Sequence, residues 1–380
     1  MIFNNTLPTT STVSSAMPIK SPFESSIAKP GQGTVVLSLL PPSNPTLTTL
    51  TYKYPLKLLT RAPGYVPQSS ALSCPASRPV HLYLLTYGGG LLPGDHIDVS
   101  ITLEPQTRMV VTTPQGSTKI FKTELNDSIK GQRGTPAPTL SDKSRQSVDV
   151  QIGREAALCY LPDPAVPYKD SRYEQLQRFT VDVTPAKGST TPAGRSTSSL
   201  CLLDWVAQGR SSRGENWDFH QWRGRNEVWG VDRTTGARRL LLRDSLILED
   251  ELDELHLEAG QETISRSELI RERTRPHGIV GTLILYGPVY ERLANFIMDR
   301  FTSQPRIGSR NWASPSPGAM ESTPNYESKV TFTAARVRAG FVLVKFGADE
   351  FETAKDWLGA ILREEGTVFN EFGEEALFCL

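Results

Sequence analysis

Several features that mark common classes of protein are missing from this sequence. It has no G-x-x-x-x-G-K-[ST] phosphate loop, no G-x-S-x-G nucleophile elbow, and no H-E-x-x-H or H-x-H pair among its five histidines. The four cysteines (Cys74, Cys159, Cys201 and Cys379) are scattered singly, which excludes a zinc knuckle and favours a reduced, cytoplasmic chain. No apolar run approaches the roughly 18 residues of a membrane span. These absences leave no motif for an enzyme, a nucleotide site or a permanently bound cofactor.

The chain also lacks a charge excess of either sign. Its 41 lysines and arginines balance 41 aspartates and glutamates, so the formal net charge is zero. Such a chain has no overall field that would attract nucleic acid or an anionic membrane, which argues against a dedicated nucleic-acid binder. Glycine and proline together make up about 15% of the 380 residues, which favours turns and strands over long helices.

The hydrophobic pattern predicts a mainly β protein. Between residues 97 and 103 every second residue is apolar, the alternation typical of a half-buried strand. Closely spaced runs of the same kind follow: RMVVTT, SVDVQI, ALCYLP, RFTVDV, LCLLDWVA, NEVWGVD and RRLLLRDSLIL. We therefore expect stacked antiparallel sheets, forming a β-sandwich or β-helix-like body.

Helical periodicity occurs in two places near the C-terminus. Pro288 suits a first helical position, and one apolar stripe follows it at Val289, Leu293, Phe296, Ile297 and Phe301. The second helix is expected from about Asp349 to a stop at Gly366, with a stripe at Phe351, Ala354, Leu358, Ile361 and Leu362. A β body carrying two packed helices is the predicted architecture.

Four segments are too polar to join a core. Residues 1–30 are expected to form a disordered N-terminal extension, ahead of a single β-rich domain over residues 31–380. Residues 129–147, 184–199 and 303–328 are rich in Pro, Gly, Ser and Thr and are expected to be flexible insertions.

The glycine run of YGGGLLPGDHIDVSITLE superficially resembles a phosphate-binding loop. That reading needs a helix after the glycines, whose free N–H groups would face the anion. Here Pro93 interrupts and a strand follows, so we expect a tight connection between strands with positive φ angles.

Aromatic and arginine residues alternate in ENWDFHQWRGRNEVWGVD. Its rings, from Trp217 to Trp229, would suit a carbohydrate- or RNA-binding β domain that stacks ligands on them. The favoured alternative is a hairpin that turns near Arg223-Gly224-Arg225 and buries its rings in a core or an interface. A third class, a hydrolase built on dispersed aspartates and histidines, has no motif in its favour.

Four ordered stretches resemble the UreD (UreH) family of urease accessory proteins, particularly its fungal members. The first is HLYLLTYGGGLLPGDHIDVSITLEPQTRMVVTTPQGSTKIFK, similar to the family's G-G-L-x-G-G-D turn, strand and T-T-x-G-x-[ST]-K segment. LCYLPDPAVPYKDSRYEQ, LLDWVAQGRSSRGENW, and RNEVWGVD with RRLLLRDSLIL follow in the expected order. Pro93 stands where the family usually has glycine, and the N-terminal extension and insertions are departures from the pattern.

The resemblance implies a scaffold without enzymatic activity that delivers nickel to urease. Its expected partners are the urease apoprotein, a UreF-type accessory protein and, through it, a UreG-type GTPase that hydrolyses GTP. It also implies a water-filled passage through which Ni²⁺ moves in transit, without a permanent cofactor. Such a passage needs oxygen ligands that release the ion, because a full His/Cys cage would trap it.

The polar positions of the matching motifs are the candidate passage residues: Asp95, Thr118, Asp204 and Glu215. Asp204 is the sharpest candidate because it lies in the apolar run CLLDWVA, where a buried carboxylate is costly unless hydrogen-bonded, paired or metal-bound. It could equally cap neighbouring backbone N–H groups. Asp95 is more simply a turn residue, and Glu215 could form a plain ion pair with Arg210.

Overall fold

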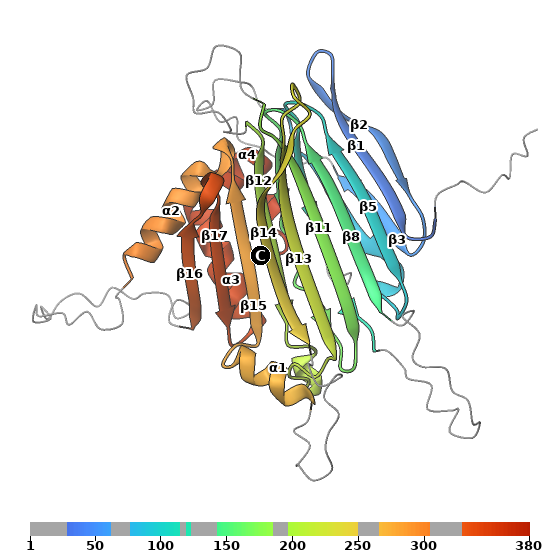
Figure 1. Ribbon diagram of the computed structural model, residues 1–380, viewed down its shortest axis with the longest axis vertical. Coiled ribbons are helices and arrows are strands. Elements are labelled where there is room, and N and C mark those ends of the chain that lie inside the picture. Colours follow the sequence, from blue (N-terminus) through green and yellow to red (C-terminus); the bar gives the residue numbers. More distant parts are fainter. Residues whose placement is uncertain are drawn as a thin grey trace, which may run out of the picture.

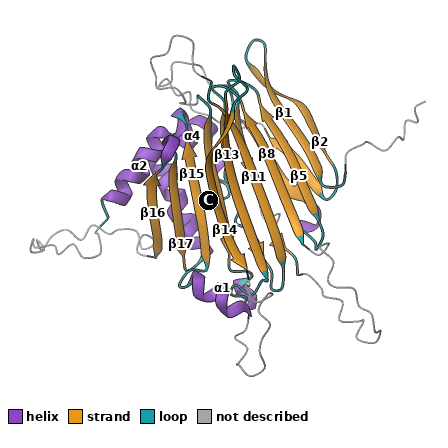
Figure 2. Ribbon diagram, viewed as in Figure 1, coloured by secondary structure: helices purple, strands orange, loops and turns teal. Residues whose placement is uncertain are grey.

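The chain folds into two stacked β-sheets with helices along one outer side (Figures 1 and 2). The computed structural model describes residues 29–61, 77–114, 119–122, 143–184, 197–249, 266–304 and 329–380. The expected N-terminal extension and the three expected insertions lie almost wholly outside these residues. Two of the predicted insertion boundaries are wrong, because strands already begin at Ser144 and Ser199.

One sheet has seven strands. In spatial order they are β14 (Arg238–Glu249), β13 (Gln221–Val231), β11 (Arg172–Asp182), β8 (Ser144–Ile152), β5 (His96–Leu103), β1 (Gln32–Leu40) and β2 (Asn44–Tyr52). Along β5, buried and exposed residues alternate almost perfectly, so this sheet has one face in the core and one in solvent.

The other sheet has eight strands. In spatial order they are β16 (Val330–Arg336), β17 (Val342–Ala348), β15 (Ile279–Tyr286), β12 (Ser199–Ala207), β9 (Ala157–Tyr160), β6 (Arg108–Thr112), β4 (Val80–Thr86) and β3 (Leu56–Arg61). A short ladder joins β7 (Lys119–Ile120) to β10 (Val166–Pro167). Almost all of β12 is buried, as expected for a strand covered on both faces.

The prediction of antiparallel sheets is wrong for the centre of both sheets. The ladders β1–β5, β5–β8, β8–β11 and β11–β13 are parallel, as are β4–β6, β6–β9 and β9–β12. From β5 to β13, leaving aside the short strands β7 and β10, the chain alternates between the two large sheets, so each strand returns beside the previous strand of its own sheet and runs in the same direction. Alternating hydrophobicity gives the same pattern for either direction, which is why the sequence did not reveal it.

Both predicted helices are present and cover the outer face of the eight-stranded sheet. A short turn at Pro288–Tyr290 leads into α2 (Glu291–Thr302), and α3 (Phe351–Glu365) ends at Gly366, which adopts a left-handed conformation. Their apolar stripes pack with β12, β15 and β17 in a second core outside the space between the sheets. Two short helices were not predicted: α1 (Arg266–Thr274) and α4 (Thr367–Phe372).

The glycine run forms a tight connection, as predicted. Gly88, Gly89 and Gly94 all have positive φ, and β5 rather than a helix follows them. The expected hairpin at Arg223-Gly224-Arg225 is wrong, because these residues lie inside the continuous strand β13, which turns into β14 only after Val231.

Candidate functional site

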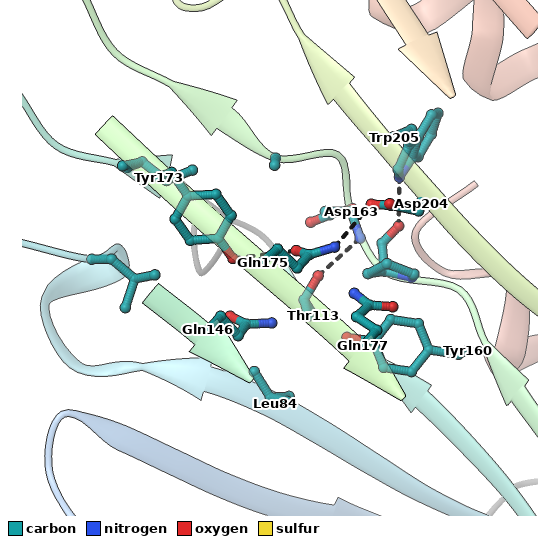
Figure 3. Close-up of a pocket in the computed structure, with 14 residues that line it drawn as sticks. Leu84, Thr113, Gln146, Tyr160, Asp163, Tyr173, Gln175, Gln177, Asp204 and Trp205 are labelled. Carbon is teal, nitrogen blue, oxygen red and sulfur yellow. Dashed lines mark hydrogen bonds between the residues drawn. The ribbon is translucent and has the colours of Figure 1, made fainter. Parts of the chain in front are cut away.

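A polar cavity lies between the two sheets (Figure 3). Its volume is about 460 Å³, including the part that opens to solvent. Its polar lining residues are Thr113, Gln146, Tyr160, Asp163, Tyr173, Gln175, Gln177 and Asp204. Because polar side chains line it alongside apolar ones, the cavity can hold ordered water, and its side-chain oxygens are possible ligands for a cation.

Asp204 is one of the residues that line this cavity. On β12, residues of one parity face the helices, and residues of the other parity, including Asp204, face the seven-stranded sheet. Gln175 donates a hydrogen bond to its Oδ1 at 3.0 Å, and Asn226 donates to its Oδ2 at 2.7 Å. Asp204 therefore lies in the interior, as predicted, and its hydrogen-bond donors are side-chain amides rather than backbone N–H groups.

The environment of Asp204 disfavours its charge. Burial raises the pKa of the carboxyl, and the nearby charge of Asp244 raises it further, while the bonds from Asn226 and Gln175 and the charge of Lys345 act in the opposite direction. Because metal binding requires the deprotonated form, a raised pKa means that protons compete with a cation for this carboxyl.

Space beside Asp204 depends on Gly224 in the facing strand β13. A Cβ at this position would lie 3.5 Å from Asp204 Oδ2 and 3.2 Å from Trp222 Nε1. Glycine therefore keeps the approach to the carboxylate open, which explains a glycine in the interior of a long strand.

A second carboxyl, Asp163, lies elsewhere in the same cavity. Its backbone N–H donates to Thr113 Oγ1 at 2.9 Å. Burial raises the pKa of Asp163, and a hydrogen bond with the Cys379 side chain lowers it. Burial also raises the pKa of Cys379 and keeps it a thiol. This pairing brings the C-terminal end of the chain to the cavity, which the sequence did not indicate.

Two buried side-chain oxygens beside the cavity lack hydrogen-bond donors among the described residues: Gln177 Oε1 and Asn226 Oδ1. Gln177 and Asn226 are only 2% and 1% exposed, and they are neighbours in the β11–β13 ladder. An unpartnered buried acceptor is unfavourable, so both oxygens favour a donor or a cation in the adjacent space.

The other sequence-predicted residues lie elsewhere. Asp95 closes the turn before β5, where its Oδ2 accepts from the backbone N–H of Leu92 at 2.8 Å, and it does not line the cavity. Thr118 lies outside the described residues. This geometry of Asp95 supports the turn interpretation, while a nickel role for either residue stays a prediction.

Glu215 forms the ion pair with Arg210 that the sequence suggested as an alternative. Its Oε1 accepts from Arg210 Nε at 2.9 Å, and its Oε2 accepts from the Arg210 backbone N–H at 2.9 Å. Burial opposes ionisation of Glu215, but the bonds from Arg210 outweigh it and lower the pKa. Arg210 also stacks over the Tyr168 ring at 3.7 Å. Both Glu215 oxygens are thus committed to the loop after β12.

The aromatic stretch does not form a stacking surface. Trp217, Phe219 and Trp222 are at most 2% exposed, and Trp222 packs against Tyr173 with ring centroids 4.8 Å apart. Trp229 is half-buried, with the Arg238 guanidinium 4.5 Å from its ring centroid. Trp217, Phe219 and Trp222 belong to the core, as the favoured interpretation predicted, whereas Trp229 does not.

Compact metal centres are not found in the part of the chain that the structure describes. No group of three or more His, Cys, Asp or Glu side chains is placed to hold an ion there. Cys159, Cys201 and Cys379 are free and buried, and Cys159 is the register partner of Cys201 across the β9–β12 ladder. Among the described helices, none combines the length and apolar character needed to span a bilayer.

Fold and site together define a β-rich protein with helices on one outer face and an oxygen-lined cavity between its sheets. The family model described as UreD urease accessory protein matches residues 31–370. The chain therefore belongs to the UreD family of urease accessory proteins, which confirms the resemblance seen in its motifs.

Curated relatives agree with this assignment. The chain is 28% identical to "Urease accessory protein 4" of Cryptococcus neoformans over 88% of its own length and 90% of that protein. It is 29% identical to "Urease accessory protein D" of Arabidopsis thaliana, over 84% and 91% of the two chains. A Schizosaccharomyces pombe protein named "Uncharacterized urease accessory protein ureD-like" is 28% identical over 82% and 87%.

Proposed function

We propose that this chain is a non-catalytic urease maturation factor that acts in the cytoplasm. It holds the urease apoprotein and a UreF-type accessory protein, and it passes Ni²⁺ from a UreG-type GTPase towards the urease active site. The observation that carries this proposal is the cavity between the sheets, whose polar lining includes the carboxyl of Asp204.

The chemistry of the cavity suits an ion in transit. Amide, hydroxyl and carboxyl oxygens bind Ni²⁺ less tightly than imidazole or thiolate, so an ion held by them is released again. The two carboxyl groups of the lining, Asp163 and Asp204, both have a raised pKa, which lets protons compete with the metal. Conduction through a protein requires such sites, attractive enough to enter and weak enough to leave.

The sequence is consistent with a division of labour between this chain and a GTPase. The chain has no phosphate loop, so GTP hydrolysis is assigned to the UreG-type partner. Membership of the UreD family and relatives named urease accessory proteins support a place in urease maturation.

Nickel-limited activation of urease in vitro tests the role of Asp204. Asp204→Asn and Asp204→Ala should leave the complex with UreF and urease intact by mass, yet lower the nickel content of urease. The matched control is Asp98→Asn, because Asp98 is an exposed aspartate of β5 that lies outside the cavity. Full activation by both Asp204 variants at limiting nickel would contradict the proposal.

A further inference from the structure

The polar interior continues beyond the cavity to one open side of the sandwich. Lys345 of β17 donates to Asp244 Oδ1 of β14 at 2.8 Å and contacts Thr282 Oγ1 of β15 at 3.4 Å. The Asp244 side chain is 10% exposed and that of Lys345 is 48% exposed. This ion pair therefore joins the two sheets at the border between the interior and solvent.

Backbone register ties the ion pair to Asp204. Thr282 is the partner of Asp204 in the β12–β15 ladder and of Lys345 in the β15–β17 ladder. In the other sheet, Asn226 is the partner of Asp244 and donates to Asp204. Two carboxyl groups and one ammonium group thus share one polar cluster, and the charges of both Asp244 and Lys345 influence the pKa of Asp204.

The cluster contains more acidic groups than basic ones. Lys345 supplies one positive charge against the two carboxyl groups of Asp204 and Asp244. The unpartnered oxygens of Gln177 and Asn226 lie on the neighbouring strands β11 and β13. A divalent cation would balance the charge of both carboxylates, which one ammonium group reaching in from the solvent side does not do.

We propose that Lys345 is an exchangeable counter-ion of this cluster. Its ammonium group pairs with Asp244 and partly offsets the charge of Asp204 when the cluster holds no metal, and an incoming divalent cation displaces it into solvent. The inference rests on the proposed transit of Ni²⁺ and adds how an ion is admitted and released. Displacement is easy because Lys345 is already half exposed and carries a flexible stem. Its return competes with the bound ion and keeps the affinity modest.

Calorimetric titration of the full chain with Ni²⁺ tests the exchange. Lys345→Gln removes the competitor, and since a partly exposed ion pair contributes at most about 1 kcal/mol, the Kd should fall by up to about fivefold. Lys345→Arg retains the charge and should stay within about twofold of the wild type. The control is Lys57→Gln, because Lys57 belongs to β3 at the opposite edge of the same sheet.

Amine labelling read by mass spectrometry provides a second, independent measurement. Saturating Ni²⁺ should raise the labelling rate of Lys345 at least about twofold, with Lys57 in the same sample unchanged. In Asp204→Asn the increase should disappear. Unchanged Kd in Lys345→Gln together with unchanged labelling in the wild type would overturn the counter-ion role while leaving nickel transit standing. Absence of Ni²⁺ binding in both the wild type and Lys345→Gln would overturn both proposals.

Discussion

Gly224 allows access to Asp204 to be varied without touching the carboxylate. An added Cβ meets Trp222 Nε1 at 3.2 Å and Asp204 Oδ2 at 3.5 Å, so Gly224→Ala requires only a small adjustment. Replacing a strand glycine also removes about 0.5–1 kcal/mol of unfolded-state entropy. We expect the free energy of unfolding of Gly224→Ala to lie within about 1 kcal/mol of that of the wild type.

Gly224→Val adds two further methyl groups to the same crowded place. Overpacking of this kind costs about 1–3 kcal/mol, which a folded domain of this size tolerates. Methyl groups at this position would lie against the Asp204 carboxylate, so they should hinder the approach of an ion to it. Nickel delivery should therefore fall steeply in Gly224→Val and little in Gly224→Ala.

Two measurements on the same preparations separate the effects. Urea unfolding followed by tryptophan fluorescence gives the change in free energy of unfolding, and nickel-limited activation of urease gives delivery. A second crowded strand glycine, Gly230, provides the control, because an added Cβ there would meet Val183 and Leu241 rather than Asp204. If Gly224→Val folds, assembles and delivers nickel like the wild type, the passage does not run beside Asp204.

Further results are expected at three places: the Arg210–Glu215 pair, Asp204 and Trp222. Arg210→Met strands the buried carboxylate of Glu215 and should cost about 2 kcal/mol, less than a fully buried pair because Arg210 is partly exposed. The pKa of Glu215 is lowered in the folded state, so its contribution to stability is present above the unfolded pKa and is lost as pH falls through the folded pKa. In chemical unfolding, the stability of Glu215→Gln should therefore depend less on acid pH than that of the wild type. For Asp204 the sign is opposite: its pKa is raised, so wild-type stability should fall as pH rises from about 3.9 towards the raised folded pKa, and Asp204→Asn should lack this slope. Trp222→Ala should cost about 3–5 kcal/mol by thermal unfolding, and filter binding should detect no retention of single-stranded RNA by the wild type, since this ring is buried against Tyr173.

Part of this site could be predicted from the sequence, because it depends on residues that are close together along the chain. An acid inside the apolar run CLLDWVA predicted a carboxyl in the interior, and Asp204 lies there. The simpler interpretations of Asp95 and Glu215 also agree with the structure, because their partners, Leu92 and Arg210, are within five residues along the chain. Short-range partners of this kind follow from turn chemistry and charge pairing alone.

Partners from distant strands were not predictable in the same way. Asn226, Asp244 and Lys345 reach Asp204 only through the register of four ladders in two sheets, which hydrophobic alternation does not encode. The sequence does contain one indication of the polar interior. On β11, Gln175 and Gln177 share the parity of core residues, so two amides at interior positions already indicated a polar space between the sheets.

The position of the Asp204 carboxyl depends on how the two sheets are stacked as well as on its own strand. Within β12, its neighbours Leu203 and Trp205 face the helices, and a shift of one residue would move the carboxyl into that apolar core. Its hydrogen-bond donors, Gln175 and Asn226, both come from the opposite sheet. Loosening the contact between the sheets therefore removes the ligand geometry before either sheet unfolds, and substitutions at the sheet interface should impair nickel transit at smaller losses of stability than substitutions beneath α2 and α3.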